Sequence, residues 1–127
     1  MWQNINGHLV QTTDKSRVMF KTTISYEILE HLKGLAEEHD TYVNYLLENG
    51  IKKVIEDDHI QYNKALRPKD RVQYKSMYNS ELLDALRKFA VEHNLFINDV
   101  IEYSAKFIDT EMVPKKEFRN RIEFRTN

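Results

Sequence analysis

The 127-residue sequence contains no cysteine, three glycines, two prolines and one tryptophan. Without cysteine the chain forms no disulfide and no thiolate metal site, which fits a reducing compartment such as the cytoplasm. No apolar run approaches the roughly 20 residues of a membrane span, and residues 1–8 lack the basic and apolar regions of a signal peptide. The net charge is −1, so the total charge by itself indicates no nucleic-acid partner. We therefore expect one cytoplasmic domain of ordinary size with no membrane contact.

Motifs of enzymes are also missing. The sequence contains no nucleophile elbow, no phosphate-binding loop and no paired-carboxylate motif. His39 and His93 occupy corresponding positions, but no His-x-x-x-His pattern accompanies them. We interpret both as residues near helix C-termini, where the helix dipole favours them. The expectation is a protein without enzymatic activity, metal or cofactor.

The most informative feature present is an internal repeat. Residues 15–57 align without a gap on residues 69–111, and 13 of the 43 aligned pairs are identical. Such a repeat fixes the symmetry of a fold and has to be considered first. A unit of this size is too small to bury an adequate core alone, so the two copies are expected to pack together. The sequence divides into an N-terminal extension (1–14), a first repeat (15–57), a linker (58–68), a second repeat (69–111) and a basic tail (112–127).

Each copy predicts one strand followed by two helices. Residues 17–24 and 71–78 alternate in the manner of half-buried strands. Ser25 and Asn79 are suitable helix N-caps, and Asp40 and Asn94 tolerate the left-handed backbone that follows many helices. The second helix is predicted by residues with helical spacing: Val43, Leu46, Leu47, Ile51, Val54 and Ile55 in the first copy, and Ile97, Val100, Ile101, Ala105 and Ile108 in the second. At one position in each second helix, Gly50 and Ser104 are small enough for close helix packing.

A single strand per unit leaves its backbone groups unpaired, so the two strands are expected to pair with each other. Antiparallel pairing would make a ribbon across a pseudo-twofold axis, with four helices beneath it. The predicted fold is therefore mostly α with a two-stranded antiparallel β-ribbon, in which the two fused repeats form one domain.

The outward face of this ribbon is expected to be basic. Six cations and no carboxylate fall on it or at its entrances, although the whole chain is nearly neutral. A two-stranded ribbon fits the major groove of DNA, where long polar side chains read base edges. The outward residues, with the lysines at the strand entrances, are Lys15, Arg17, Met19, Lys21, Thr23, Lys69, Arg71, Gln73, Lys75 and Met77. The bland alternative is a solubilising surface strand.

Both copies resemble the ribbon-helix-helix (MetJ/Arc-type) DNA-binding family, in its tandem single-chain form. The resemblance implies a transcriptional regulator, most simply a repressor, that binds double-stranded DNA in the nucleoid. It also implies that Met19, Lys21, Thr23, Gln73, Lys75 and Met77 read bases. Phosphates would be contacted by the start of each second helix and by the basic residues at the strand entrances, namely Tyr42, Val43, Asn44, Phe96, Ile97, Asn98, Lys15, Arg17, Lys69 and Arg71. Asn44 and Asn98 are equally open to a purely capping role.

The sequence departs from the family pattern at several positions. Asp40 and Asn94 replace the usual turn glycine, and Tyr42 and Phe96 replace a serine that is common at the second helix. The two strands also differ, because Met19 aligns with Gln73 and Thr23 with Met77, which predicts an imperfectly palindromic DNA site.

The segments outside the repeats leave further possibilities open. Asn6-Gly7 could form a hairpin turn. The tail alternates apolar residues (Phe118, Ile122, Phe124) with charged ones, which predicts a strand that either closes on its own domain or orders on a partner. An antitoxin whose tail binds a toxin, and an interaction module that has lost DNA binding, are therefore alternative functions. Self-association on adjacent DNA sites is also expected.

Overall fold

Two nine-residue strands form the ribbon in the computed structural model, which describes residues 2–5, 8–11 and 16–116. Strand β3 (Arg17–Ser25) pairs antiparallel with β4 (Arg71–Asn79), as expected because each unit has a single strand that needs a partner. The register places Lys21 directly opposite Lys75, so the middles of the two strands coincide. A separate antiparallel pair, β1 (Trp2–Ile5) and β2 (His8–Gln11), precedes the ribbon. It brackets the predicted Asn6-Gly7 turn, which itself lies outside the described residues.

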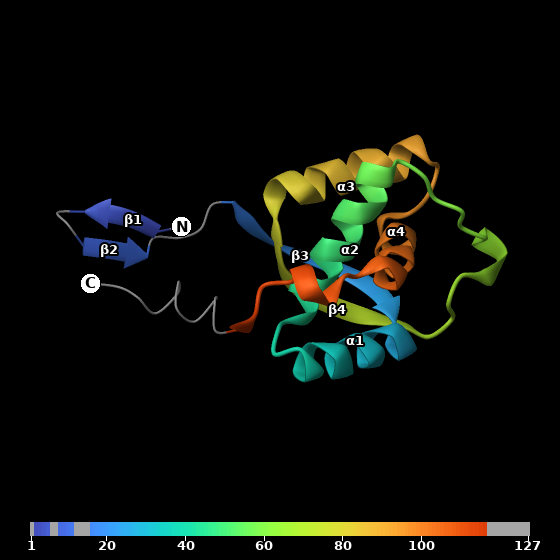
Figure 1. The fold of residues 1–127 in the computed structure, drawn as a ribbon. Helices are drawn as coiled ribbons and strands as arrows, with labels where there is room; N and C mark the ends of the chain where they lie inside the picture. The colour runs from blue at the N-terminus through green and yellow to red at the C-terminus, as the bar shows by residue number, and fades with distance from the viewer. Residues whose placement is uncertain (1, 6–7, 12–15, 117–127) are drawn as a thin grey trace.

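Each ribbon strand leads directly into two helices. Helix α1 (Tyr26–Glu38) and helix α2 (Val43–Asp57) follow β3, and helix α3 (Ser80–Glu92) and helix α4 (Ile97–Ser104) follow β4. Figure 1 shows α2 and α4 between α1 and α3, with the ribbon against them. Residues 16–116 therefore combine a two-stranded antiparallel sheet with four α-helices.

The predicted caps and turns are confirmed. The Ser25 hydroxyl accepts a hydrogen bond from the backbone N–H of Ile28, and the Asn79 side chain accepts one from Leu82, at 3.3 and 3.0 Å. Asp40 and Asn94 have φ angles of 51° and 54°. This left-handed backbone ends the first helix of each unit and turns the chain toward the second.

The core lies between the ribbon and the four helices. The fully buried side chains include Ile24, Leu32, Leu46, Leu47, Ile51, Leu86, Val100 and Ile101. On the helix side of the ribbon, Phe20 and Tyr78 meet edge to face, with ring centroids 6.0 Å apart. At the centre of the core α2 packs on α4 at Gly50, where an added Cβ would collide with the carbonyl oxygen of Ser104. The small residues predicted at these two positions thus permit a close approach of the helix backbones.

The second helix of the second unit is shorter than predicted. The expectation that it includes Ala105 and Ile108 is wrong, because α4 ends at Ser104 and a 3-10 turn (Ala105–Phe107) follows. The Asn49 side chain accepts the backbone N–H of Asp109 at 2.7 Å. This contact holds the chain against α2, away from the direction in which α4 would have continued.

Short 3-10 turns occupy the connections. One (Lys64–Leu66) lies in the linker between the units, and another (Thr110–Met112) follows α4. Beyond it, Lys116 donates its backbone N–H to the carbonyl of Asp40 at 2.7 Å. The strand predicted between Phe118 and Phe124 lies outside the described residues.

Candidate nucleic-acid interface

The outward face of the ribbon carries the residues that were predicted to read bases. Met19 is 53% exposed, and Lys21 and Thr23 of β3 are exposed as well. Gln73 and Lys75 are exposed on β4, whereas Met77 is half-buried. The register sets Met19 opposite Met77 and Thr23 opposite Gln73, on either side of the central lysine pair. The structure therefore brings these six side chains together on one narrow surface.

The central pair, Lys21 and Lys75, is electrostatically unfavourable by itself. Like charges directly opposite each other in an antiparallel pair destabilise the sheet by about 0.2–1 kcal/mol. Neither strand contains an acidic residue, so no carboxylate within the ribbon offsets these two charges. An anion over the middle of the ribbon would relieve this repulsion.

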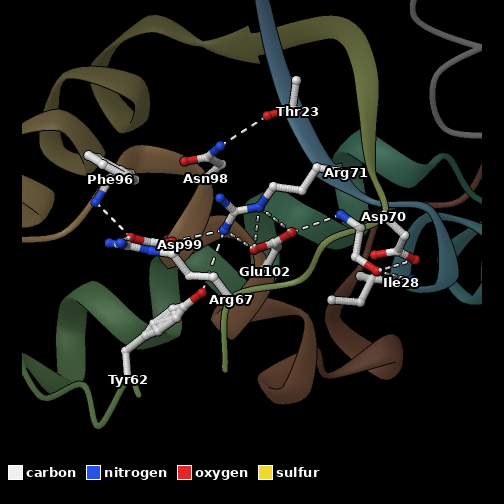
Figure 2. Close-up of polar contacts among 11 residues, drawn as sticks. Thr23, Ile28, Tyr62, Arg67, Asp70, Arg71, Phe96, Asn98, Asp99 and Glu102 are labelled. Atoms are coloured by element: carbon white, nitrogen blue, oxygen red, sulfur yellow. Dashed lines mark hydrogen bonds and ion pairs between the residues drawn. The ribbon is translucent and has the colours of Figure 1, made fainter. Parts of the chain in front are cut away.

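Arg17 and Arg71 differ from the sequence expectation. The Arg17 guanidinium donates to Glu48 of α2 at 2.6 Å, and Arg71 donates to Glu102 of α4 and to Asp99. Figure 2 shows Arg71 between these two carboxylates. The hydrogen bond to Glu102 raises the pKa of Arg71 above its usual value. The prediction of six cations on this face is therefore wrong for the two arginines, because carboxylates of the second helices neutralise both of them. Lys69 remains exposed beside β4, and Lys15 lies outside the described residues.

The glutamates that bind these arginines also bind the residue paired with each arginine, at the C-terminal end of the opposite strand. A carboxylate oxygen of Glu48 accepts the backbone N–H of Asn79 at 3.0 Å, and Glu102 accepts that of Ser25 at 2.7 Å. Each second helix is therefore fixed to both strands of the ribbon through one acidic side chain. The sequence interpretation missed Glu48 and Glu102, although they belong to the identical pairs of the repeat.

The asparagines at the start of each second helix also contact the ribbon. Asn44 is buried and donates to the carbonyl oxygen of Met77 at 2.8 Å. Asn98 donates to the hydroxyl of Thr23 at 3.0 Å, as Figure 2 shows. These contacts fix the helix starts beside the ribbon, so both asparagines have a structural role whether or not they meet a phosphate.

The two helix starts differ in charge. At α4 the buried Asp99 carboxylate accepts the backbone N–H of Phe96 at 2.9 Å, so this amide already has a partner. At α2 the first turn contains no acidic residue, and Lys116 lies over the ring of Tyr42, 5.3 Å from its centroid. Val43 and Ile97 follow the two cap residues and are half-buried. Of the two predicted phosphate contacts, the one at α2 thus has the more favourable electrostatics.

Asp99 is the centre of a cluster of charged groups. Its side chain is fully buried, and it accepts two hydrogen bonds from Arg67, at 3.0 and 2.7 Å, and one from Arg71. Burial alone would raise the pKa of Asp99, but the bonds from Arg67 and Arg71 outweigh it and hold the pKa well below its usual range. The guanidinium of Arg67 also lies over the ring of Phe96, 4.3 Å from its centroid. This cluster fixes the linker to α4.

Within residues 16–116 and the two described N-terminal strands, no group of three or more His, Asp or Glu side chains is placed to hold a metal ion. No helix in the same part of the chain has the length and apolar character needed to cross a membrane.

Comparison with known proteins gives no relative for this chain: no protein-family model, no curated protein and no solved structure matches it.

Proposed function

We propose that this protein is a single-chain ribbon-helix-helix pseudodimer that binds double-stranded DNA through the outward face of β3 and β4. It would act in the cytoplasm, on the nucleoid, as a sequence-specific transcriptional repressor that excludes polymerase from its site.

The correspondence of the two units is supported by contacts that recur 54 positions apart. The pair Arg17–Glu48 corresponds to the pair Arg71–Glu102. In the same way, the backbone bond from Tyr26 to Asp70 corresponds to that from Ser80 to Ser16. The two backbone bonds cross between the units, one in each direction, which is typical of an intertwined dimer, here joined by the linker.

The observation that carries the DNA proposal is the exposed lysine pair at the centre of an acid-free ribbon. A ribbon whose strands lie about 4.8 Å apart fits, with its side chains, into a major groove about 12 Å wide. There Lys21 and Lys75 can donate to O6 and N7 of guanines, and Gln73 can pair with an adenine edge. The methyl groups of Met19, Thr23 and Met77 can contact thymine methyls.

The phosphate contacts would be unequal. At α2, backbone amides, the helix dipole and Lys116 favour a phosphate, whereas at α4 the amide of Phe96 is already bonded to Asp99. Together with the different ribbon residues of β3 and β4, this asymmetry supports an operator that departs from perfect palindromy. Several chains are expected to bind adjacent sites, because one ribbon reads only a short sequence.

Capture of DNA by the purified protein tests the proposal. Fragmented genomic and plasmid DNA is incubated with the parent protein and with the double variant Lys21→Ala, Lys75→Ala at moderate salt, and the retained DNA is sequenced. We expect one recurring sequence that only the parent retains. If neither protein enriches any sequence, the ribbon does not read DNA, and a role in protein interaction replaces the proposal.

A further inference from the structure

A groove of about 650 Å³ lies beside Arg17, on one flank of α2. Its walls come from α2, from the start of α3 and from the segment that follows α4, and they include Tyr45, Asn49, Lys52, Leu82, Met112 and Pro114. This volume is within the range of ordinary ligand sites, about 300–1,000 Å³. Its lining combines apolar walls with charged and amide groups, as ligand sites generally do.

The corresponding flank of the second unit is covered by the protein's own linker. The residues that correspond to Arg17 and Asn49 are Arg71 and Tyr103. Arg71 donates to the Tyr62 hydroxyl at 3.5 Å, and the Tyr103 hydroxyl accepts the backbone N–H of Gln61 at 3.4 Å. Figure 2 shows Tyr62 directed at the charged group of Arg67, Asp99 and Arg71. In the second unit this flank is therefore contacted by Gln61 and Tyr62 of the linker, and the tyrosine hydroxyl meets the arginine.

Among residues 16–116 the first unit has no such cover, because its corresponding segment is shorter. In both units a cation from the segment that follows a second helix lies over the aromatic residue at the start of the other second helix: Arg67 over Phe96, and Lys116 over Tyr42. Ten residues lead from Asp58 to Arg67, but only five lead from Met112, its counterpart, to Lys116. The shorter path places no further residues over this flank of α2, so the groove is open as far as residues 16–116 are concerned.

We propose that this groove binds an extended peptide of a partner protein, with a tyrosine whose hydroxyl meets the Arg17 guanidinium. The ring of that tyrosine would lie against Leu82 and Met112. Two cations (Arg17, Lys52) and two carboxylates (Glu48, Glu81) balance each other around the groove. A peptide without charged residues therefore suits the groove. The linker stretch Ile60–Asn63, which covers the other flank, is likewise uncharged. The inference rests on the proposed correspondence of the two units but not on DNA binding.

A peptide titration followed by NMR tests the inference. The probe is a synthetic, end-blocked peptide with the sequence of residues 59–63, added to the isotope-labelled full chain without DNA. We expect saturable shifts of the backbone amides of Asn49 and Lys52. Replacing the peptide's tyrosine by alanine should weaken binding about 30-fold, as the loss of a central aromatic anchor does.

The matched protein variants are Met112→Arg, which fills the groove, and Val91→Arg, a control on α3. Both residues are strongly exposed, at 72% and 80%, so neither change threatens the fold. Met112→Arg should abolish the shifts, and Val91→Arg should leave them unchanged. Absence of saturable shifts, or shifts that persist in Met112→Arg, would overturn the inference. If the chain binds this peptide but no DNA, the proposed DNA-binding function is refuted and the inference about the groove stands.

Discussion

Replacement of glycine by alanine at two helix positions is expected to change the free energy of unfolding in opposite directions. Gly34 lies on the exposed side of α1, where an added Cβ meets nothing within 4 Å. Gly50 lies inside α2, where an added Cβ would overlap the carbonyl group of Ser104. Both are interior helix positions, so the intrinsic preference of helices for alanine over glycine, about 1 kcal/mol, applies to each.

The packing at the two positions decides the sign. Gly34→Ala should raise the free energy of unfolding by about 0.5–1 kcal/mol, since nothing opposes the gain in helix propensity. At Gly50 the obstacle is backbone, which cannot rotate away, so α2 and α4 must separate. Overpacking of a core costs about 1–3 kcal/mol or more, and rigid backbone belongs at the upper end. After subtraction of the propensity gain, Gly50→Ala should lower the free energy of unfolding by about 2 kcal/mol.

Denaturant unfolding monitored by circular dichroism measures both variants against the parent. The expected result is a higher midpoint for Gly34→Ala and a clearly lower one for Gly50→Ala, with unchanged slopes. If Gly50→Ala proves as stable as Gly34→Ala, α2 and α4 do not approach each other as described, and the central packing of the two units is wrong.

Three further predictions concern stability. Asp99→Asn should lower the free energy of unfolding by about 2–4 kcal/mol, because Arg67 and Arg71 lose their buried charged partner but still reach solvent. Thermal unfolding measures this change. Unchanged stability would show that the contacts of Asp99 with the two arginines do not stabilise the fold. Since the pKa of Asp99 is lowered in the folded protein, its contribution is present above the unfolded pKa of about 3.9 and is lost as the pH falls below that value; urea unfolding from pH 6 to pH 2 should show a shallower acid decline in Asp99→Asn than in the parent. Asn79→Ala should cost about 1 kcal/mol through loss of the α3 cap, whereas Lys33→Ala on the exposed face of α1 should change the midpoint little.

The sequence predicted the local structure well because local rules determine it. Alternation predicted both ribbon strands, Ser25 and Asn79 were identified as caps, and the left-handed turns fell at Asp40 and Asn94. The antiparallel pairing followed from a physical requirement, since a single strand in each unit needs a partner.

Long-range polar contacts were harder to predict. The alternation of β3 and β4 placed Arg17 and Arg71 on the outward face, but alternation carries no information about which carboxylate a long side chain can reach. The repeat did contain a usable signal, because an arginine and a glutamate 31 positions apart are identical in both copies. Two residues retained together in both units can be partners of each other rather than of a ligand.

The early end of α4 was also not predictable from helical spacing. The apolar positions Ala105 and Ile108 continue the pattern, but the contact of Asp109 with Asn49 diverts the chain. The groove beside Arg17 depends on the length and path of the segment that follows α4, and no residue pattern specifies either.

The most direct test of the account measures binding of the parent protein and two variants to the duplex recovered in the capture experiment. The variant Lys21→Ala, Lys75→Ala removes the central ribbon lysines. The control variant Lys33→Ala, Lys88→Ala removes the same charge from the exposed faces of α1 and α3. A base-reading contact contributes about 1–3 kcal/mol, so we expect the ribbon variant to bind at least about 30-fold more weakly than the parent. The control should bind within a few-fold of the parent. Equal affinity of the ribbon variant and the control would contradict a DNA-reading ribbon.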